Sequence, residues 1–241
     1  MTMDKQDKKC MQLLSLGVIF GIIFIFIFLT AVKFVWADSI NPQVFPIDSK
    51  PYGMTYGQWT AKWFQWLMSI PLADNPAADD TGKNCGQKQE GPVWFLPGTA
   101  GGKAERTCTI PAQKAILFPI ISAEYSYKEY PNLKTESELR KGVVLNQDKV
   151  TSLEASVDGI QLKDLRKYRV QSPLFDATLA RDNLFGVPAG PTRAVADGFW
   201  ILLQPLSPGK HDIHFKGSEV DFTSTGTNSF ATDVTYHLNV K

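Results

Sequence analysis

ATDVTYHLNV, residues 231–240, alternates apolar and polar side chains. Successive side chains of a β-strand point to opposite faces of the sheet, so this pattern predicts a strand with one buried face. The side chains expected on that face are Val234, Tyr236, Leu238 and Val240. A turn at residues 207–209 (SPG) precedes a second expected strand over residues 210–216. The C-terminal part of the chain therefore predicts β-structure.

Strand signals continue toward the N-terminus. The apolar run 199–203 (FWILL) is typical of a strand buried on both faces. Asp158-Gly159 between apolar segments indicates a hairpin over residues 151–162. Further short strands are expected at residues 92–97, 106–110, 114–121 and 175–179, the second and third of these pairing around Pro111-Ala112-Gln113. Short strands separated by turns predict a mainly β fold, a β-sandwich of the Ig-like or jelly-roll-like type.

One helix carries an unusual row of tryptophans. Thr55 and Gln58 form a capping-box pattern, and Pro71 ends the helical pattern, so the helix is expected over residues 56–69. The three indoles lie on one face at helical spacing: Trp59, Trp63 and Trp66. We expect this face to pack the helix on the sandwich. The alternative is a partly exposed aromatic platform for a sugar, a lipid surface or a partner protein. A second capped helix is expected over residues 136–149.

The N-terminal residues predict export. The apolar run 13–32 follows Lys5, Lys8 and Lys9 and has about the 20 residues that a helix needs to cross a bilayer. Val35-Trp36-Ala37 also fits a signal-peptidase site, so both a cleaved signal peptide and a retained membrane anchor stay open. The leading lysines favour a cytoplasmic N-terminus under either interpretation. We expect residues 1–37 as signal or anchor, 38–54 as an extended lead-in and 55–241 as one domain.

Charge and composition exclude two classes of protein. Lys and Arg number 25 against 24 Asp and Glu, so the formal net charge of +1 gives no electrostatic basis for binding nucleic acid. A hydrophobic content of 44% and a charged content of 20% are ordinary for a globular protein rather than a disordered one. A membrane contact is expected only through the N-terminal segment, if that segment is retained.

Cys85 and Cys108 predict a disulfide, because thiols of exported proteins oxidise. Two separate buried thiols or a redox pair are the alternatives. The polar loop before Cys85 contains Asp79 and Asp80, which are candidate binding residues. They fit an irregular cation site with Asn84, or a loop of Asx turns tied down by the disulfide. An EF-hand is excluded because Ala77 and Lys88 occupy the ends of the twelve-residue pattern, where carboxylates are required.

The histidines lie near the C-terminus and raise the question of a metal. His211 and His214 fall on opposite faces of their expected strand, so they cannot bind one ion together. His214 and His237 both fall on polar faces and are weak candidates for metal ligands if their strands pair. The alternative is a set of exposed strand histidines, and we expect no cofactor.

No catalytic signature is present. The chain contains neither Gly-x-Ser-x-Gly nor His-Glu-x-x-His, and no spacing rule selects a carboxylate pair. The favoured interpretation is a non-enzymatic binding or cell-envelope module in an extracytoplasmic location, with an envelope protein or a glycan as its partner. Two alternatives stay open. One is a secreted hydrolase for a glycan or ester, with its site near Trp63, Trp66 and the Asp79 loop, and the other is a purely structural envelope protein.

Four motifs span most of the chain after the apolar segment. They are WTAKWFQW (59–66), DDTGKNC (79–85), GPVWFL (91–96) and PLSPGKH (205–211). Together they resemble a family of exported microbial proteins of unknown function. The resemblance implies export and a single domain, and it assigns no catalytic residue. The long apolar segment differs from family members with shorter signal peptides, so secretion and anchoring both remain open.

Overall fold

The computed structural model describes residues 41, 43–223 and 226–241. The apolar segment 13–32 and the expected cleavage site at 35–37 lie outside the described residues. None of the helices within the described ranges combines the length and apolar character needed to cross a membrane.

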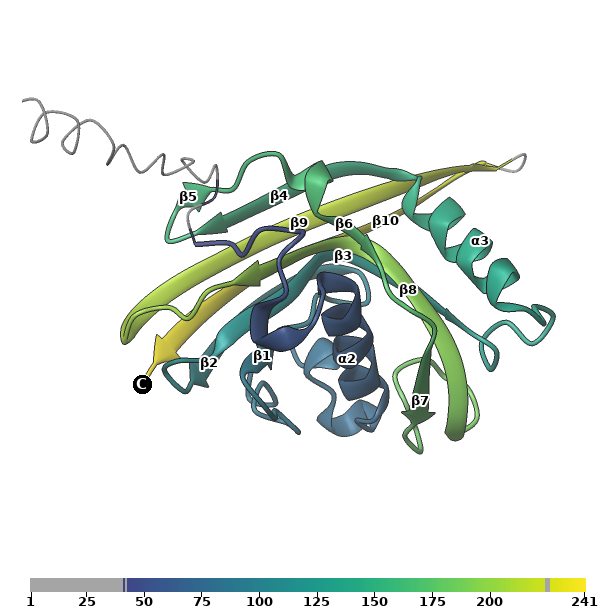
Figure 1. Cartoon of the computed structure of the whole chain (residues 1–241), viewed down its shortest axis with the longest axis horizontal. Helices are drawn as coiled ribbons and strands as arrows, with labels where there is room; N and C mark the ends of the chain where they lie inside the picture. Colours follow the sequence, from purple (N-terminus) through teal and green to yellow (C-terminus); the bar gives the residue numbers. More distant parts are fainter. Residues whose placement is uncertain (1–40, 42, 224–225) are drawn as a thin grey trace, which may run out of the picture. The chain divides into compact units, whose positions relative to one another are not determined.

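Two mixed five-stranded sheets pack together, which confirms a mainly β fold (Figure 1). The first sheet has the order β1-β3-β8-β6, and β7 also pairs with β8. Its strands are β1 (Val93–Phe95), β3 (Ala115–Ser126), β6 (Arg169–Gln171), β7 (Phe175–Leu179) and β8 (Gly190–Leu203). The second sheet has the order β2-β10-β9-β4-β5. Its strands are β2 (Gly102–Ile110), β4 (Val150–Val157), β5 (Ile160–Gln161), β9 (Gly209–Thr223) and β10 (Gly226–Val240). Each sheet holds one parallel pair, β1 with β3 and β2 with β10.

The main core lies between the two sheets. Phe118 of β3 stacks on Phe215 of β9, with ring centroids 4.8 Å apart. The expected inner face of β10 is buried, as predicted, at Val234, Tyr236, Leu238 and Val240. The sheets approach closely at Gly217, because a Cβ atom there would lie 2.6 Å from the Cβ atom of Ile121. Any larger residue at position 217 would therefore force the sheets apart.

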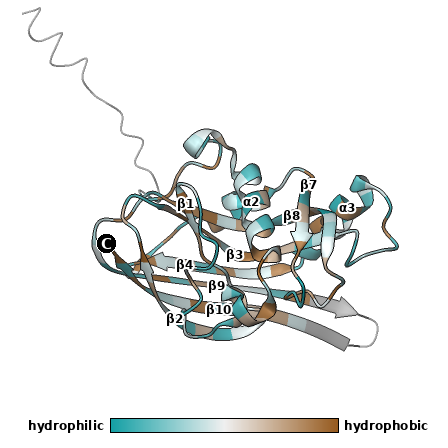
Figure 2. Ribbon diagram, turned by 90° about the horizontal axis from the view of Figure 1, so that it is seen from below, coloured by the Kyte–Doolittle hydropathy of each residue, from teal (hydrophilic) through white to brown (hydrophobic). Residues whose placement is uncertain are grey.

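A second core lies on the other face of the first sheet, where helix α2 (Tyr56–Met68) packs. Figure 1 shows α2 on the concave side of the curved sheet, and Figure 2 shows α2, β3 and β9 in successive layers. Thr55 and Gln58 form the predicted capping box. Trp63 meets Trp200 of β8 edge to face, with ring centroids 5.2 Å apart. Burying such large rings supplies much of the hydrophobic free energy of this layer.

Helix α3 (Glu136–Gln147) covers another part of the first sheet through Leu139 and Val143, which are fully buried against Val195. Its predicted capping box, Thr135 with Glu138, is present. The predicted hairpin of β4 and β5 turns at Asp158-Gly159. Short 3-10 helices complete the described elements: η1 (Pro51–Gly53), η2 (Leu72–Asp74), η3 (Pro76–Ala78) and η4 (Leu165–Tyr168).

The predicted pairing of residues 106–110 with 114–121 is wrong. Strand β2 pairs with β10 of the second sheet, whereas β3 pairs with β1 and β8 of the first. The physical reason lies in burial: β2 is covered on one face and alternates, while Ala115–Ile121 is buried without interruption because β3 has packed layers on both sides. The chain between these strands therefore crosses from one sheet to the other.

Candidate functional site

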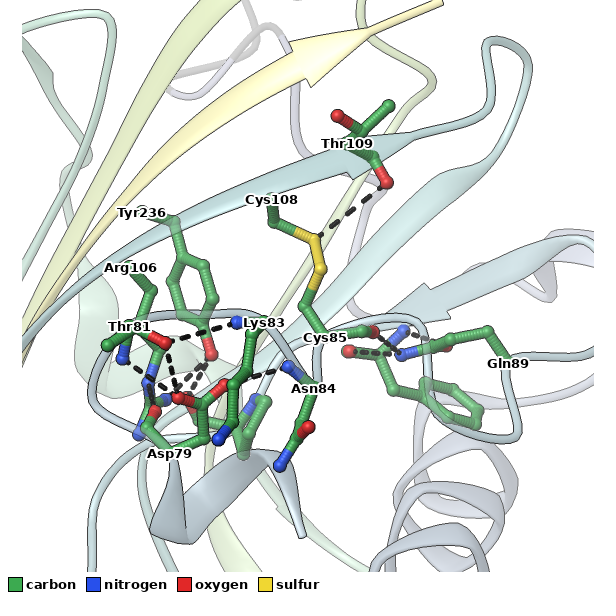
Figure 3. The surroundings of a disulfide bond; sticks show 12 residues. Asp79, Thr81, Lys83, Asn84, Cys85, Gln89, Arg106, Cys108, Thr109 and Tyr236 are labelled. Atoms are coloured by element: carbon green, nitrogen blue, oxygen red, sulfur yellow. Dashed lines mark hydrogen bonds between the residues drawn. A yellow bond between two sulfur atoms is a disulfide. The ribbon is translucent and has the colours of Figure 1, made fainter. Parts of the chain in front are cut away.

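The Asp79 loop is a structural element fastened to β2. The predicted disulfide Cys85–Cys108 is present (Figure 3). The Asp79 carboxylate accepts hydrogen bonds from the backbone N–H and hydroxyl of Thr81, at 3.0 and 2.7 Å, and from the Asn84 N–H at 2.8 Å. Burial works against ionisation, but these bonds and the nearby Arg106 charge lower the pKa of Asp79. Asp79 thus forms the Asx-turn arrangement, and Asp80 is exposed.

Arg106 of β2 completes this fastening. Arg106 is 1% exposed, and its guanidinium donates to five oxygens, so its charge is stabilised by neutral acceptors. The acceptors are the carbonyls of Ala77, Asp79, Pro97 and Gly98 and the hydroxyl of Tyr236. These bonds tie the Asp79 loop and the segment after β1 to the second sheet.

The tryptophan row lies in the core rather than on an exposed platform. Trp59, Trp63 and Trp66 are 4%, 3% and 6% exposed. Each indole N–H donates to a backbone carbonyl: Trp59 to Pro51 at 2.9 Å, Trp63 to Leu96 at 3.2 Å and Trp66 to Gln87 at 2.7 Å. Their polar atoms are therefore engaged within the chain, although one side of Trp63 borders the cavity described below.

The strands that carry the histidines, β9 and β10, do pair. Each histidine nevertheless contacts different carboxylates. His214 Nε2 lies 2.9 Å from Asp233, while His237 contacts Asp212 at 2.7 Å and Glu105 at 2.8 Å. His211 Nδ1 lies 2.8 Å from Asp158. Within the described ranges, no group of three or more His, Cys, Asp or Glu residues is arranged to hold a metal ion. The structure does not bring His214 and His237 together as one ligand set.

A β-bulge in β3 decides which face of the sheet carries the side chain of Glu124, a residue that the sequence pattern does not single out. Pro119 faces Trp200 and Ile121 faces Phe199, so Ile120 is an extra residue in the pairing with β8. A bulge of one residue reverses which side chains point to each face downstream. Glu124 therefore lies opposite Ala196, whose side chain belongs to the core beneath α2.

Glu124 has no donor to satisfy it. The residue is 6% exposed, and neither of its carboxyl oxygens accepts a hydrogen bond within the described chain. Burial, together with the proximity of Glu129, raises the pKa of Glu124 well above its ordinary value. Glu129 follows β3 and accepts a 2.7 Å bond from the Ser126 hydroxyl.

A cavity of about 250 Å³ borders this pair of carboxyl groups. On this side β1 pairs with β3 only as far as Leu117, so among the described strands none covers the rest of that edge. The aromatic residues of the cavity wall are Trp63, Phe64, Phe185 and Phe230. Ala100 also lines it and is exposed, so the cavity reaches the surface there. An aromatic cavity with one unsatisfied polar group is typical of a small-molecule site.

One sequence signal for this site was available. The expected strand ended at Ile121, but β3 continues to Ser126 and carries Glu124 into a buried layer. A glutamate within an otherwise apolar strand stretch is unusual, because Glu is almost never fully buried without a partner. The bulge that decides its direction has no comparable signature in the residues 119–121 (PII).

No family model, curated protein or solved structure matches this chain. The resemblance to exported microbial proteins therefore stays a prediction. The geometry of the cavity is what supports a function.

Proposed function

We propose that this chain is an extracytoplasmic, non-enzymatic binding protein that takes up a small ligand in the cavity beside Glu124. The observation that carries the proposal is a buried carboxyl group without a donor in the wall of an aromatic cavity. Leaving a buried polar group unsatisfied costs about 1–3 kcal/mol. A ligand that supplies the missing hydrogen bond removes this cost and gains affinity from it.

The location outside the cytoplasm is part of the proposal. It is supported by the Cys85–Cys108 disulfide, since such bonds persist in oxidising compartments. The lysines before the apolar run 13–32 support the same orientation. A sandwich of the Ig-like or jelly-roll-like type also remains a proposal. The parallel edge pairs of both sheets separate it from purely antiparallel sandwiches.

A fragment screen on the full chain, with its disulfide intact and in mild detergent, tests the binding function. A ligand at about 100 times its Kd adds about 2.7 kcal/mol to the free energy of unfolding. Each kcal/mol raises the thermal midpoint by about 2–4 °C in a domain of this size. We expect shifts for small aromatic compounds that carry a hydrogen-bonding group.

The variant Ala100→Trp locates the binding. Ala100 lies at the surface opening of the cavity, so an indole there blocks access. Ala73→Trp is the matched control, because Ala73 is also exposed but lies outside the cavity wall. We expect the first variant to abolish the shifts and the second to keep them. A wild-type protein that melts cooperatively and responds to no fragment would contradict the proposed function.

The carboxyl pair favours one second candidate, hydrolysis of an ester. Two neighbouring carboxyl groups in environments that set their pKa values apart can act as general acid and general base. Hydrolysis of p-nitrophenyl acetate distinguishes a binding protein from an esterase. If the wild type hydrolyses this ester and both Glu124→Gln and Glu129→Gln lose the activity, the protein is a hydrolase and the proposed binding function is wrong.

A further inference from the structure

The two ionisable side chains of the cavity wall are both acidic: Glu124 and Glu129 line the cavity. None of the residues that line the cavity is Lys, Arg or His. The neighbouring Lys128 instead donates to the backbone carbonyls of Pro188 and Ala189. A negative charge in apolar surroundings without a positive partner is unfavourable, and a cationic ligand would balance it.

We propose that the cavity selects a small organic ammonium ion, whose nitrogen is bound by Glu124 and Glu129 and whose apolar body contacts the aromatic wall. This inference rests on the proposed binding function and names its class of ligand. Trp63 and three phenylalanines line the cavity, and aromatic rings attract cations as well as apolar groups. An ammonium group supplies the donors that Glu124 lacks within the described chain.

A metal ion fits the same walls poorly. Calcium takes 6–8 oxygen ligands and magnesium close to six, whereas the acidic residues of this wall are only Glu124 and Glu129. The hydroxyl groups of Thr99 and Thr232 already bond to each other at 3.0 Å. The remaining wall is largely aromatic and aliphatic, which suits the body of an organic ion better than a hydrated metal.

The volume sets the size of the ligand. A dry apolar cavity of about 150 Å³ already holds benzene. The cavity here, of about 250 Å³, therefore has room for one aromatic ring with a short ammonium-bearing arm. Benzylamine, protonated at pH 7, is the matching probe, and benzyl alcohol is its neutral counterpart of nearly equal shape.

Calorimetric titration of the full chain with both probes tests the inference. We expect benzylamine to bind about 10–100 times more tightly than benzyl alcohol, the range for hydrogen bonds to charged groups. Glu124→Gln should remove this preference, with Glu129→Gln as a second variant. Glu154→Gln is the matched control, because Glu154 is exposed on β4 and outside this cavity. It should retain the preference for benzylamine.

The outcomes separate the inference from the proposed function. Equal affinity for the two probes, or a preference for benzylamine that survives both Glu124→Gln and Glu129→Gln, would overturn the ammonium ligand and leave the binding function in place. Binding of neither probe, with no response in the fragment screen, would overturn both.

Discussion

At the scale of single residues, the chain buries two ionisable side chains, and only one of them has hydrogen-bond partners. The three nitrogens of the Arg106 guanidinium all donate to oxygens, and these bonds fasten loops to a sheet. Glu124 has no donor, and burial keeps it protonated beside Glu129. Proteins tend to retain unfavourable groups of the second kind where function needs them. Glu124 should therefore reduce stability in the ligand-free protein.

Glu124→Gln should stabilise the protein at high pH. The folded-state pKa of Glu124 lies above its unfolded value, so the stability linked to its proton is present below about pH 4.5 and is lost as the pH rises through the folded pKa. Glutamine keeps the shape and an N–H donor without titrating. We expect equal free energies of unfolding near pH 4 and an increasing advantage for the variant toward pH 8, measured by urea denaturation.

Glu154→Gln provides the comparison for this prediction. Glu154 is exposed, so its replacement should leave the pH dependence unchanged. A Glu124→Gln variant that parallels the wild type at every pH would show that Glu124 is ionised in the folded protein.

At the scale of elements, local signals predicted most of what the structure shows. Thr55 and Thr135 begin α2 and α3 with capping boxes, and Asp158-Gly159 forms the hairpin turn. Such features depend on a few adjacent residues. The assignment of β2 and β3 to different sheets depends on contacts far apart in sequence, as does the bulge at Ile120. The sequence does not predict the candidate site, because the bulge decides which face of the sheet the Glu124 side chain lies on.

The disulfide and Arg106 hold the same loop, so their contributions can be separated. Replacing Cys85 and Cys108 by alanine should lower the free energy of unfolding by about 3 kcal/mol, the chain-entropy value for a loop of this length. That loss corresponds to a fall in the thermal midpoint of roughly 6–12 °C. Cooperative melting should persist, because Arg106 still binds Ala77 and Asp79.

Differential scanning calorimetry checks this result, with a Thr151→Ala variant as an exposed control on β4. Loss of the cooperative transition in the double alanine variant would show instead that the disulfide, and not Arg106, holds the loop in place.

At the scale of the whole described fold, the two faces of the second sheet carry different kinds of side chain. Its inner face forms the core with β3, while its outer face carries histidine–carboxylate pairs across neighbouring strands. His237 of β10 joins Asp212 of β9 to Glu105 of β2. On the opposite face, at the end of the sheet, His211 of β9 meets Asp158 in the β4–β5 turn. These pairs connect every strand of one end of the sheet, so their protonation affects the sheet as a unit.

The pH dependence of stability should reveal these pairs. Hydrogen bonds to Glu105 and Asp212 raise the pKa of His237, and for His211 the bond to Asp158 outweighs the opposing effect of burial. The stability from both pairs is therefore present below about pH 6.5 and is lost as the pH rises through the raised values. Glu124 acts in the same direction, so the comparison is made in the Glu124→Gln background. In that background we expect the free energy of unfolding to fall between pH 6 and 8.5. His211→Gln and His237→Gln should each make this fall smaller by about 0.2–1 kcal/mol, the range for exposed ion pairs.

Urea denaturation at pH 6 and at pH 8.5 measures the fall. If both histidine variants show the full fall, the pH dependence comes from other groups in the fold.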